Sequence, residues 1–129
     1  MAERKIGGNS LTESKTILET TVKAASSKRA ENIIALDMEN VSLLADYFVI
    51  MSANSNRQVA AIADEIVDQN EKNGESVRHV EGQRAAEWIL IDLGDVIVNV
   101  FQTDQRKFYN LEKLWSQANP VDVQKWVEA

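Results

Sequence analysis

The sequence predicts an α/β domain in which helices pack on a mixed sheet of about five strands. Apolar residues recur at helical spacing in three segments, short β-branched runs lie between these segments, and a two-residue turn joins two of the runs. The resulting order is helix-strand-strand-helix-strand-strand-strand-helix. Strands that follow one another without an intervening helix are most simply antiparallel, so we expect antiparallel pairs within the sheet.

The first element is an amphipathic helix over residues 10–28. Ser10 and Glu13 have capping-box spacing, in which two side chains satisfy free backbone N–H groups at a helix start. Apolar residues then recur every three or four positions, which gives the helix one face for burial. Residues 1–9 include paired glycines and are expected to form a flexible leader.

Two strands and a second helix follow. The runs 32–38 and 46–51 are rich in β-branched and aromatic residues. The second run is almost entirely apolar, which favours a strand covered on both faces. Ser55 and Gln58 again have capping-box spacing. The helix that they begin should end at Asn73-Gly74, because glycine tolerates the left-handed backbone conformation.

A hairpin gives the clearest local signal. Residues 87–93 and 96–101 form two strands joined by Gly94-Asp95, and a Gly-X connection is typical of a type II′ turn. The turn predicts the register, with one aliphatic core face and one mixed face. The pairs on the core face are Leu93 with Val96, Ile91 with Val98 and Ile89 with Val100. The mixed face carries Trp88, Leu90, Asp92, Ile97, Asn99 and Phe101, with Trp88 opposite Phe101.

The remaining elements flank this hairpin. A short strand at residues 77–80 precedes it, and a third helix with an apolar side follows it over residues 103–115. The only proline, Pro120, marks a break. We expect a domain at residues 10–118, followed by a tail at residues 119–129 that can form one more short helix.

Composition is typical of a globular cytoplasmic protein. Of the 129 residues, 44% are hydrophobic and 26% are charged. The absence of cysteine excludes disulfides, thiolate zinc sites and cysteine nucleophiles, and it suits a reducing compartment. No apolar run approaches the roughly 20 residues that cross a bilayer, and residues 1–9 lack the apolar stretch of a signal peptide. We therefore expect no membrane partner.

Charge is unevenly distributed along the chain. Residues 1–29 carry six basic and three acidic residues, while the remainder carries eight and seventeen, for a net charge of −6. An acidic domain repels phosphate backbones, so strong direct binding of nucleic acid is not expected. The acidity suits a basic protein partner through charge complementarity, although it can equally serve only to keep the protein in solution.

Residues that carry catalysis are sparse. The single histidine, His79, has no cysteine or second histidine with which to form a common metal site. The sequence has neither a glycine-rich phosphate loop nor a Gly-x-Ser-x-Gly elbow. Asp37 and Glu39 share a face at a strand end and could hold Mg²⁺, but solvated carboxylates are the better interpretation. We expect no enzyme, cofactor or metal. A nucleotide-using enzyme that depends on these two carboxylates is the alternative.

Aromatic residues near the hairpin are better candidates for function. Core packing is the default role of Trp88, Tyr109 and Trp115. Trp88 competes best for a binding role because it lies on the mixed face beside Asp92. Aromatic side chains beside polar groups are the usual composition of interface hot spots.

Six segments in a fixed order resemble one protein family. They are Asn32–Asp37, Ala45–Ile50, Ser55–Val59, Val80–Gly82, Glu87–Phe101 and Phe108–Trp115. Over residues 11–118 their order and spacing are similar to the ribosomal silencing factor family, also called the RsfS or Iojap family. The resemblance implies a nucleotidyltransferase-like fold without the catalytic apparatus. It also implies binding of the large ribosomal subunit through ribosomal protein L-fourteen, which blocks joining of the small subunit and represses translation under nutrient limitation. A homodimer is implied when the protein is free.

The resemblance also implies the contact residues, because the family's hairpin and following helix supply the ribosomal contact. Carried over to this chain, they are Trp88, Asp92, Leu93, Gly94, Asp95, Arg106 and Tyr109. Asn99 departs from the family, where a histidine is common, so any pH-sensitive role at this position would be lost. A homologue from an organelle is a third interpretation, which the short leader with Glu3 disfavours.

Overall fold

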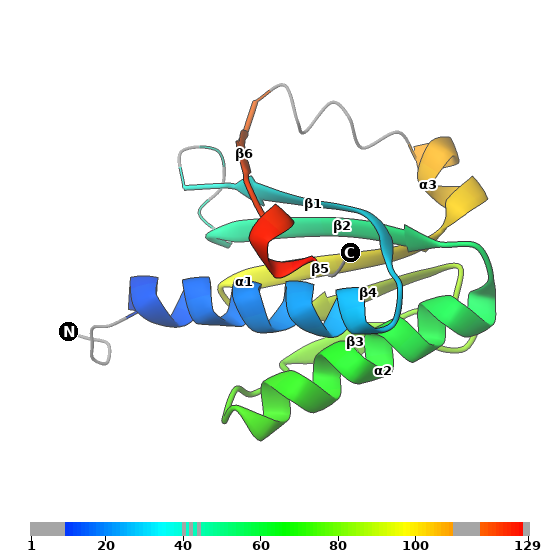
Figure 1. Cartoon of the computed structure of the whole chain (residues 1–129), viewed down its shortest axis with the longest axis horizontal. Helices are drawn as coiled ribbons and strands as arrows, with labels where there is room; N and C mark the ends of the chain where they lie inside the picture. The colour runs from blue at the N-terminus through cyan, green and yellow to red at the C-terminus, as the bar shows by residue number, and fades with distance from the viewer. Residues whose placement is uncertain (1–9, 40, 42, 44, 110–116, 128–129) are drawn as a thin grey trace.

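Two long helices cover one face of a mixed sheet (Figure 1). The computed structural model describes residues 10–39, 41, 43, 45–109 and 117–127. The elements are α1 (Ser10–Ser27), β1 (Glu31–Asp37), β2 (Tyr47–Ala53), α2 (Asn56–Lys72), β3 (His79–Glu81), β4 (Trp88–Asp92), β5 (Val96–Gln102), α3 (Thr103–Tyr109), β6 (Asn119–Val121) and the 3-10 helix η1 (Gln124–Trp126). Among the described residues the sheet has six strands, in the order β3-β4-β5-β2-β1-β6. The α/β class and the mixed sheet are confirmed, with one strand more than expected.

The second helix has the predicted signals at both ends. At its start, the Ser55 hydroxyl accepts the backbone N–H of Gln58 at 3.2 Å. At its end, Gly74 has a φ of +87°, and the N–H of Glu75 donates to the carbonyl oxygen of Asn70 at 2.9 Å. This backward bond is the Schellman arrangement that a glycine after the helix allows.

The hairpin has the predicted register. The observed pairs include Ile91 with Val98, Ile89 with Val100 and Trp88 with Phe101. The N–H of Leu93 donates to the carbonyl oxygen of Val96 at 3.0 Å and closes the two-residue turn. Gly94 has a φ of +88°, as the first central position of a type II′ turn requires. The aliphatic side chains of the hairpin belong to the main core, which also contains the apolar faces of α1 and α2.

The central strand β2 is covered on both faces, as predicted. It runs parallel to β5 and antiparallel to β1. Val49 and Met51 belong to the main core beside the two helices, while Ile50 and Ser52 point to the other face. All four side chains are almost completely buried. Burial on both faces explains why this segment is almost continuously apolar.

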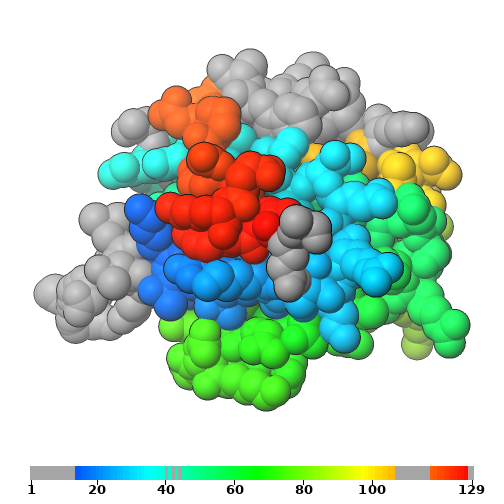
Figure 2. All heavy atoms as spheres, viewed as in Figure 1, coloured from blue at the N-terminus to red at the C-terminus, as the bar shows by residue number. Residues whose placement is uncertain are grey.

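The sixth strand lies in the segment expected to be a tail. In β6, Pro120 lies opposite Leu36 of β1. The expectation that Pro120 only breaks the chain was wrong, because an edge strand tolerates a residue that cannot donate a hydrogen bond. Beyond it, the tail contains the short helix η1, whose Trp126 packs against the main core. Figure 2 shows this segment lying over α1. The division of the chain at residue 118 stays a prediction.

Some predictions lie outside the described residues. They concern the leader at residues 1–9, the capping contact between the side chains of Ser10 and Glu13, and the continuation of the third helix from residue 110 to Trp115. Within the described part of the chain, no helix combines the length and the hydropathy needed to cross a membrane.

Candidate binding site

The face of the hairpin that points away from α1 and α2 is the candidate binding site. We call it the hairpin face. It is formed by Trp88, Leu90 and Asp92 of β4 and by Ile97, Asn99 and Phe101 of β5. Asn99 and Phe101 are completely buried, and the other four are only partly exposed. Apolar, aromatic and acidic groups therefore share one surface, with buried polar and aromatic support beneath it.

The indole of Trp88 is held in one orientation by two neighbours. Its ring stacks on Phe101 with centroids 4.9 Å apart and an interplanar angle of 26°. Its Nε1–H donates to Oδ1 of Asn99 at 2.8 Å. A stacked contact and a hydrogen bond together restrain both side-chain torsions of a tryptophan. Trp88 is thus a partly exposed aromatic group that is already oriented before any partner binds.

The loop between β3 and β4 restrains the backbone of Trp88. Gly82 has a φ of +91°, and a Cβ atom there would lie 2.1 Å from the carbonyl oxygen of Trp88. The N–H of Ala86 donates to the carbonyl oxygen of Gly82 at 2.9 Å and closes the loop. Only glycine allows the two backbones to approach this closely. No local sequence pattern indicates this role for Gly82, because the approach depends on how the loop folds back on β4.

The turn is tied to its own strand and to β2. Asp92 Oδ1 accepts the N–H of Gly94 at 2.8 Å, so this carboxylate supports the turn. The carbonyl oxygen of Asp95 accepts the N–H groups of Asp46 and Tyr47 at 2.8 and 3.1 Å. The backbone of the turn is therefore fixed at the point where β2 begins.

Acidic residues gather at this end of the sheet. The pairing of the strands places Asp37, Glu39, Asp46, Asp92 and Asp95 there, and we call this group the acidic end. Burial raises the pKa of the Tyr47 phenol above its ordinary value, and the negative charges of Asp37, Asp46 and Glu39 raise it further. The same field that disfavours a phenolate attracts cationic groups.

The structure brings some predicted site residues together and separates others. Trp88 and Asp92 lie on the hairpin face, and Gly94 and Asp95 form the adjoining turn. Leu93, in contrast, is only 4% exposed and belongs to the main core. Whether any of them contacts a partner stays a prediction.

The side chain of Arg106 forms hydrogen bonds with other residues of the chain. From α3, its guanidinium Nη1 donates to the carbonyl oxygen of Asn32 at 2.8 Å and to Oγ of Ser52 at 3.1 Å. Asn32 has a φ of +50° at an irregularity in the pairing of β1 with β2. Arg106 therefore joins α3 to the sheet. Tyr109 is the last residue of α3, and its side chain lies outside the described part.

The candidate catalytic groups have structural partners. Asp37 Oδ1 accepts the backbone N–H of Glu39 at 2.9 Å, which closes a local turn. His79 and Glu81 form an exposed pair at 3.0 Å on β3. Within the described residues, no group of three or more histidine, cysteine, aspartate or glutamate side chains could hold a metal ion. No observation favours the alternative of a nucleotide-using enzyme.

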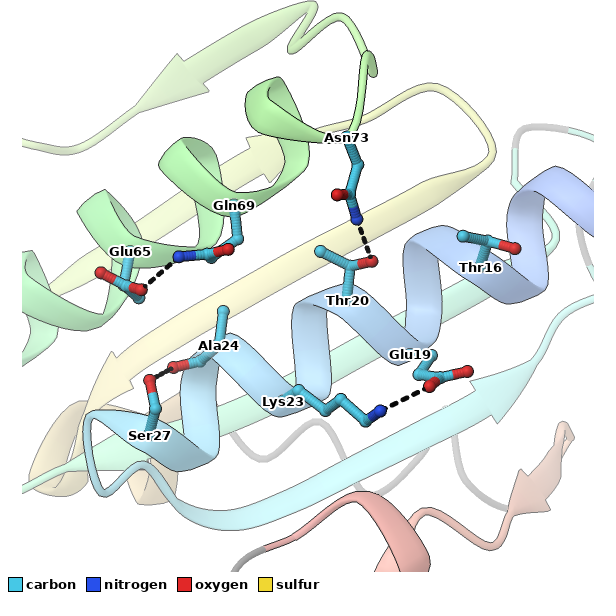
Figure 3. Close-up of a pocket in the computed structure, with 9 residues that line it drawn as sticks. All are labelled: Thr16, Glu19, Thr20, Lys23, Ala24, Ser27, Glu65, Gln69 and Asn73. Atoms are coloured by element: carbon cyan, nitrogen blue, oxygen red, sulfur yellow. Dashed lines mark hydrogen bonds and ion pairs between the residues drawn. The ribbon is translucent and has the colours of Figure 1, made fainter.

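A groove of about 480 Å³ lies between α1 and α2 (Figure 3). Six of the polar side chains that line it form three pairs, and the Ser27 hydroxyl donates to the carbonyl oxygen of Ala24 at 2.7 Å. The pairs are Asn73 Nδ2 with Thr20 Oγ1 at 2.9 Å, Lys23 Nζ with Glu19 Oε2 at 2.7 Å and Gln69 Nε2 with Glu65 Oε2 at 2.8 Å. These groups do not converge on a common point, so the groove has the character of a polar seam between helices.

Comparisons with known proteins agree on one family. A family model described as "Ribosomal silencing factor during starvation" matches residues 11–129. The ribosomal silencing factor RsfS of Bacillus subtilis is 54% identical over 109 residues, which cover 84% of this chain and 92% of that protein. A crystal structure from Bacillus halodurans has a TM-score of 0.76 at 44% identity, covering 84% of this chain and 98% of the other. One from Chromobacterium violaceum has a TM-score of 0.78 at 30% identity, covering 80% and 86%.

Proposed function

This chain belongs to the ribosomal silencing factor family, and from this premise we propose that it represses translation by occupying the large ribosomal subunit. In this proposal the protein binds ribosomal protein L-fourteen and sterically blocks joining of the small subunit when nutrients are limited. It acts in the cytoplasm as a binding protein and carries out no chemical step.

The orientation of the Trp88 indole is the single observation that assigns the proposed binding to the hairpin face. A partner that covers Trp88 would bury a large apolar ring without having to order it first, because Phe101 and Asn99 already hold it. Preorganised aromatic groups at the centre of an interface commonly supply much of the binding energy. Leu90 and Ile97 extend the apolar area, since both lie on the same face and are partly exposed.

The acidic end supports a basic partner. Its carboxylates adjoin the hairpin face at the turn, where Asp92 belongs to both groups. Proteins that bind ribosomal RNA carry many cationic side chains, and charge complementarity speeds association with such a partner and selects its orientation. We therefore propose that L-fourteen covers Trp88 and places cationic side chains beside the turn.

Subunit sedimentation tests the proposal. Purified protein should co-sediment with isolated large subunits, and small subunits added afterwards should fail to join them. Trp126→Ala is the matched control for Trp88→Ala. Trp126 is also partly buried, but it lies in η1, which packs against α1. The proposal predicts that loss of Trp88 weakens binding and that loss of Trp126 does not. Equal binding by a folded Trp88→Ala variant would overturn the assignment of the surface.

We also propose that the free protein is a homodimer, as the resemblance implied. A partly exposed apolar and aromatic surface that serves a partner can associate with a second copy when the partner is absent. Light scattering over a range of concentrations would give the mass directly. A monomer mass at every concentration would contradict this part of the proposal.

A further inference from the structure

A buried amide, the side chain of Asn99, lies beneath Trp88, and its nitrogen has no hydrogen-bond partner among the described residues. Asn99 is completely buried in the middle of β5, between Leu90 of β4 and Ile50 of β2. Its Oδ1 accepts the indole N–H of Trp88 at 2.8 Å. Its Nδ2 finds no hydrogen-bond partner among the described residues. The amide therefore accepts one hydrogen bond at its oxygen and leaves the N–H groups of Nδ2 unpaired among the described residues.

An unpaired buried donor reduces stability. Leaving one unsatisfied costs more than a typical hydrogen bond returns, so an apolar side chain of similar size would suit the fold at this position at least as well. The neighbours of Asn99 across the strands, Leu90 and Ile50, are themselves apolar. What Asn99 supplies and an apolar residue could not is the acceptor for the indole.

The hydrogen bond and the stacked contact restrain different parts of Trp88. Stacking on Phe101 fixes the plane of the indole ring. It does not determine the position of the ring within that plane, or which edge of the ring points into the protein. The hydrogen bond that Nε1–H donates to Asn99 specifies which edge of the indole points into the protein. The opposite edge, which carries only carbon, must then face outward.

We propose that Asn99 is the positioning residue that presents the carbon edge of the Trp88 indole to the partner, and that it thereby sets the affinity of the hairpin face. This inference rests on the proposed function for its partner. The orientation of the indole can nevertheless be tested on the free protein.

Two variants separate positioning from packing. Asn99→Leu removes the acceptor and the unpaired donors while keeping the branching and the number of heavy atoms of the side chain, whereas Asn99→His retains a ring nitrogen that can accept the indole N–H. Asn70→Leu is the matched control. Asn70 is completely buried between α1 and α2, and its Oδ1 lacks a partner among the described residues.

The ¹H–¹⁵N signal of the Trp88 indole, assigned by its loss in Trp88→Phe, is the first readout. In Asn99→Leu it should move upfield and exchange faster with water. In Asn99→His and in Asn70→Leu it should keep its protection. An unchanged indole signal in a folded Asn99→Leu protein would overturn the positioning role, whether or not the protein binds ribosomes.

Binding to large subunits is the second readout. Loss of one hydrogen bond that orients the indole should weaken binding by Asn99→Leu about tenfold, with an unfolding midpoint close to that of the wild type, because removal of the unpaired amide N–H groups offsets loss of the acceptor for the indole. Asn99→His should bind within about threefold of the wild type. If Asn99→Leu both binds more weakly and unfolds at a lower midpoint, and if Asn99→His does not restore binding, Asn99 has a packing role and the inference is overturned. Failure of the wild-type protein to bind would overturn the proposed function and the affinity part of this inference, while the indole signal still decides the orientation.

Discussion

Three glycines with nearly the same backbone conformation should respond very differently to alanine. Gly74, Gly82 and Gly94 have φ values of +87°, +91° and +88°. A Cβ atom at Gly74 would meet nothing within 4 Å, whereas at Gly94 it would lie 3.1 Å from the Arg78 side chain. At Gly82 it would lie 2.1 Å from the carbonyl oxygen of Trp88. The three substitutions therefore share one conformational cost and differ in steric cost.

The magnitudes follow from these distances. A left-handed conformation costs an alanine about 1–2 kcal/mol, which is the whole effect expected for Gly74→Ala. Gly94→Ala should cost little more, because the Arg78 side chain can move aside. For Gly82→Ala the backbone of β4 must move, since real Cβ atoms essentially never come within 3.0 Å of another heavy atom. We expect a total of about 3–5 kcal/mol, at the upper end for single substitutions.

Urea unfolding of the three variants under identical conditions measures this series. Because domains of this size are stable by roughly 5–15 kcal/mol, all three should still fold. The midpoints should fall slightly and similarly for Gly74→Ala and Gly94→Ala and much further for Gly82→Ala, at a common slope. Equal losses for Gly74→Ala and Gly82→Ala would refute the close approach of the loop to Trp88.

Three further variants test the site. Asp92→Asn keeps the acceptor for the turn but removes a charge, so stability should change by less than about 0.5 kcal/mol while binding becomes less sensitive to salt; Asp92→Ala should lose about 1 kcal/mol more, and equal stability would contradict the turn contact. A raised pKa of Tyr47 stabilises the native state below about pH 10 and loses this effect as pH rises through the folded pKa. The wild type should therefore lose more stability than Tyr47→Phe between about pH 9 and 11, and parallel losses would contradict the shift. Arg106→Ala removes both hydrogen bonds that Nη1 donates to Asn32 and Ser52 and should cost about 1–2 kcal/mol, with faster hydrogen exchange in α3; unchanged exchange would contradict the contact.

Local features of the fold could be predicted because their causes are local. The Gly94-Asp95 connection determines its own turn and the register of the strands on either side. Ser55 and the glycine after α2 mark the ends of that helix through contacts within a few residues. Periodic apolar residues then show which face each element buries.

Long-range features could not be predicted, since no local pattern specifies them. The parallel pairing of β2 with β5 joins segments separated in the chain by α2, β3 and β4. Strand β6 was missed because Pro120 is a poor strand residue except at an edge, and edges are defined only by the complete sheet.

The candidate site shows the same division. The sequence placed Trp88 opposite Phe101 correctly, because alternation along the hairpin requires it. The hydrogen bond from Trp88 to Asn99 and the internal contacts of Arg106 depend on side-chain directions that alternation does not specify. Leu93 was grouped with the contact residues by resemblance; its side chain is buried in the main core, and its contact with a partner stays a prediction.

Binding of the Trp88→Ala variant to isolated large ribosomal subunits tests the central claim most directly. Removal of a preorganised aromatic group at the centre of an interface should cost about 2–4 kcal/mol, or roughly 30- to 1,000-fold in affinity. We expect that the folded variant no longer co-sediments with large subunits and no longer prevents small subunits from joining. The Trp126→Ala variant should still co-sediment with large subunits and still prevent joining. Wild-type affinity in a folded Trp88→Ala protein would contradict the central claim.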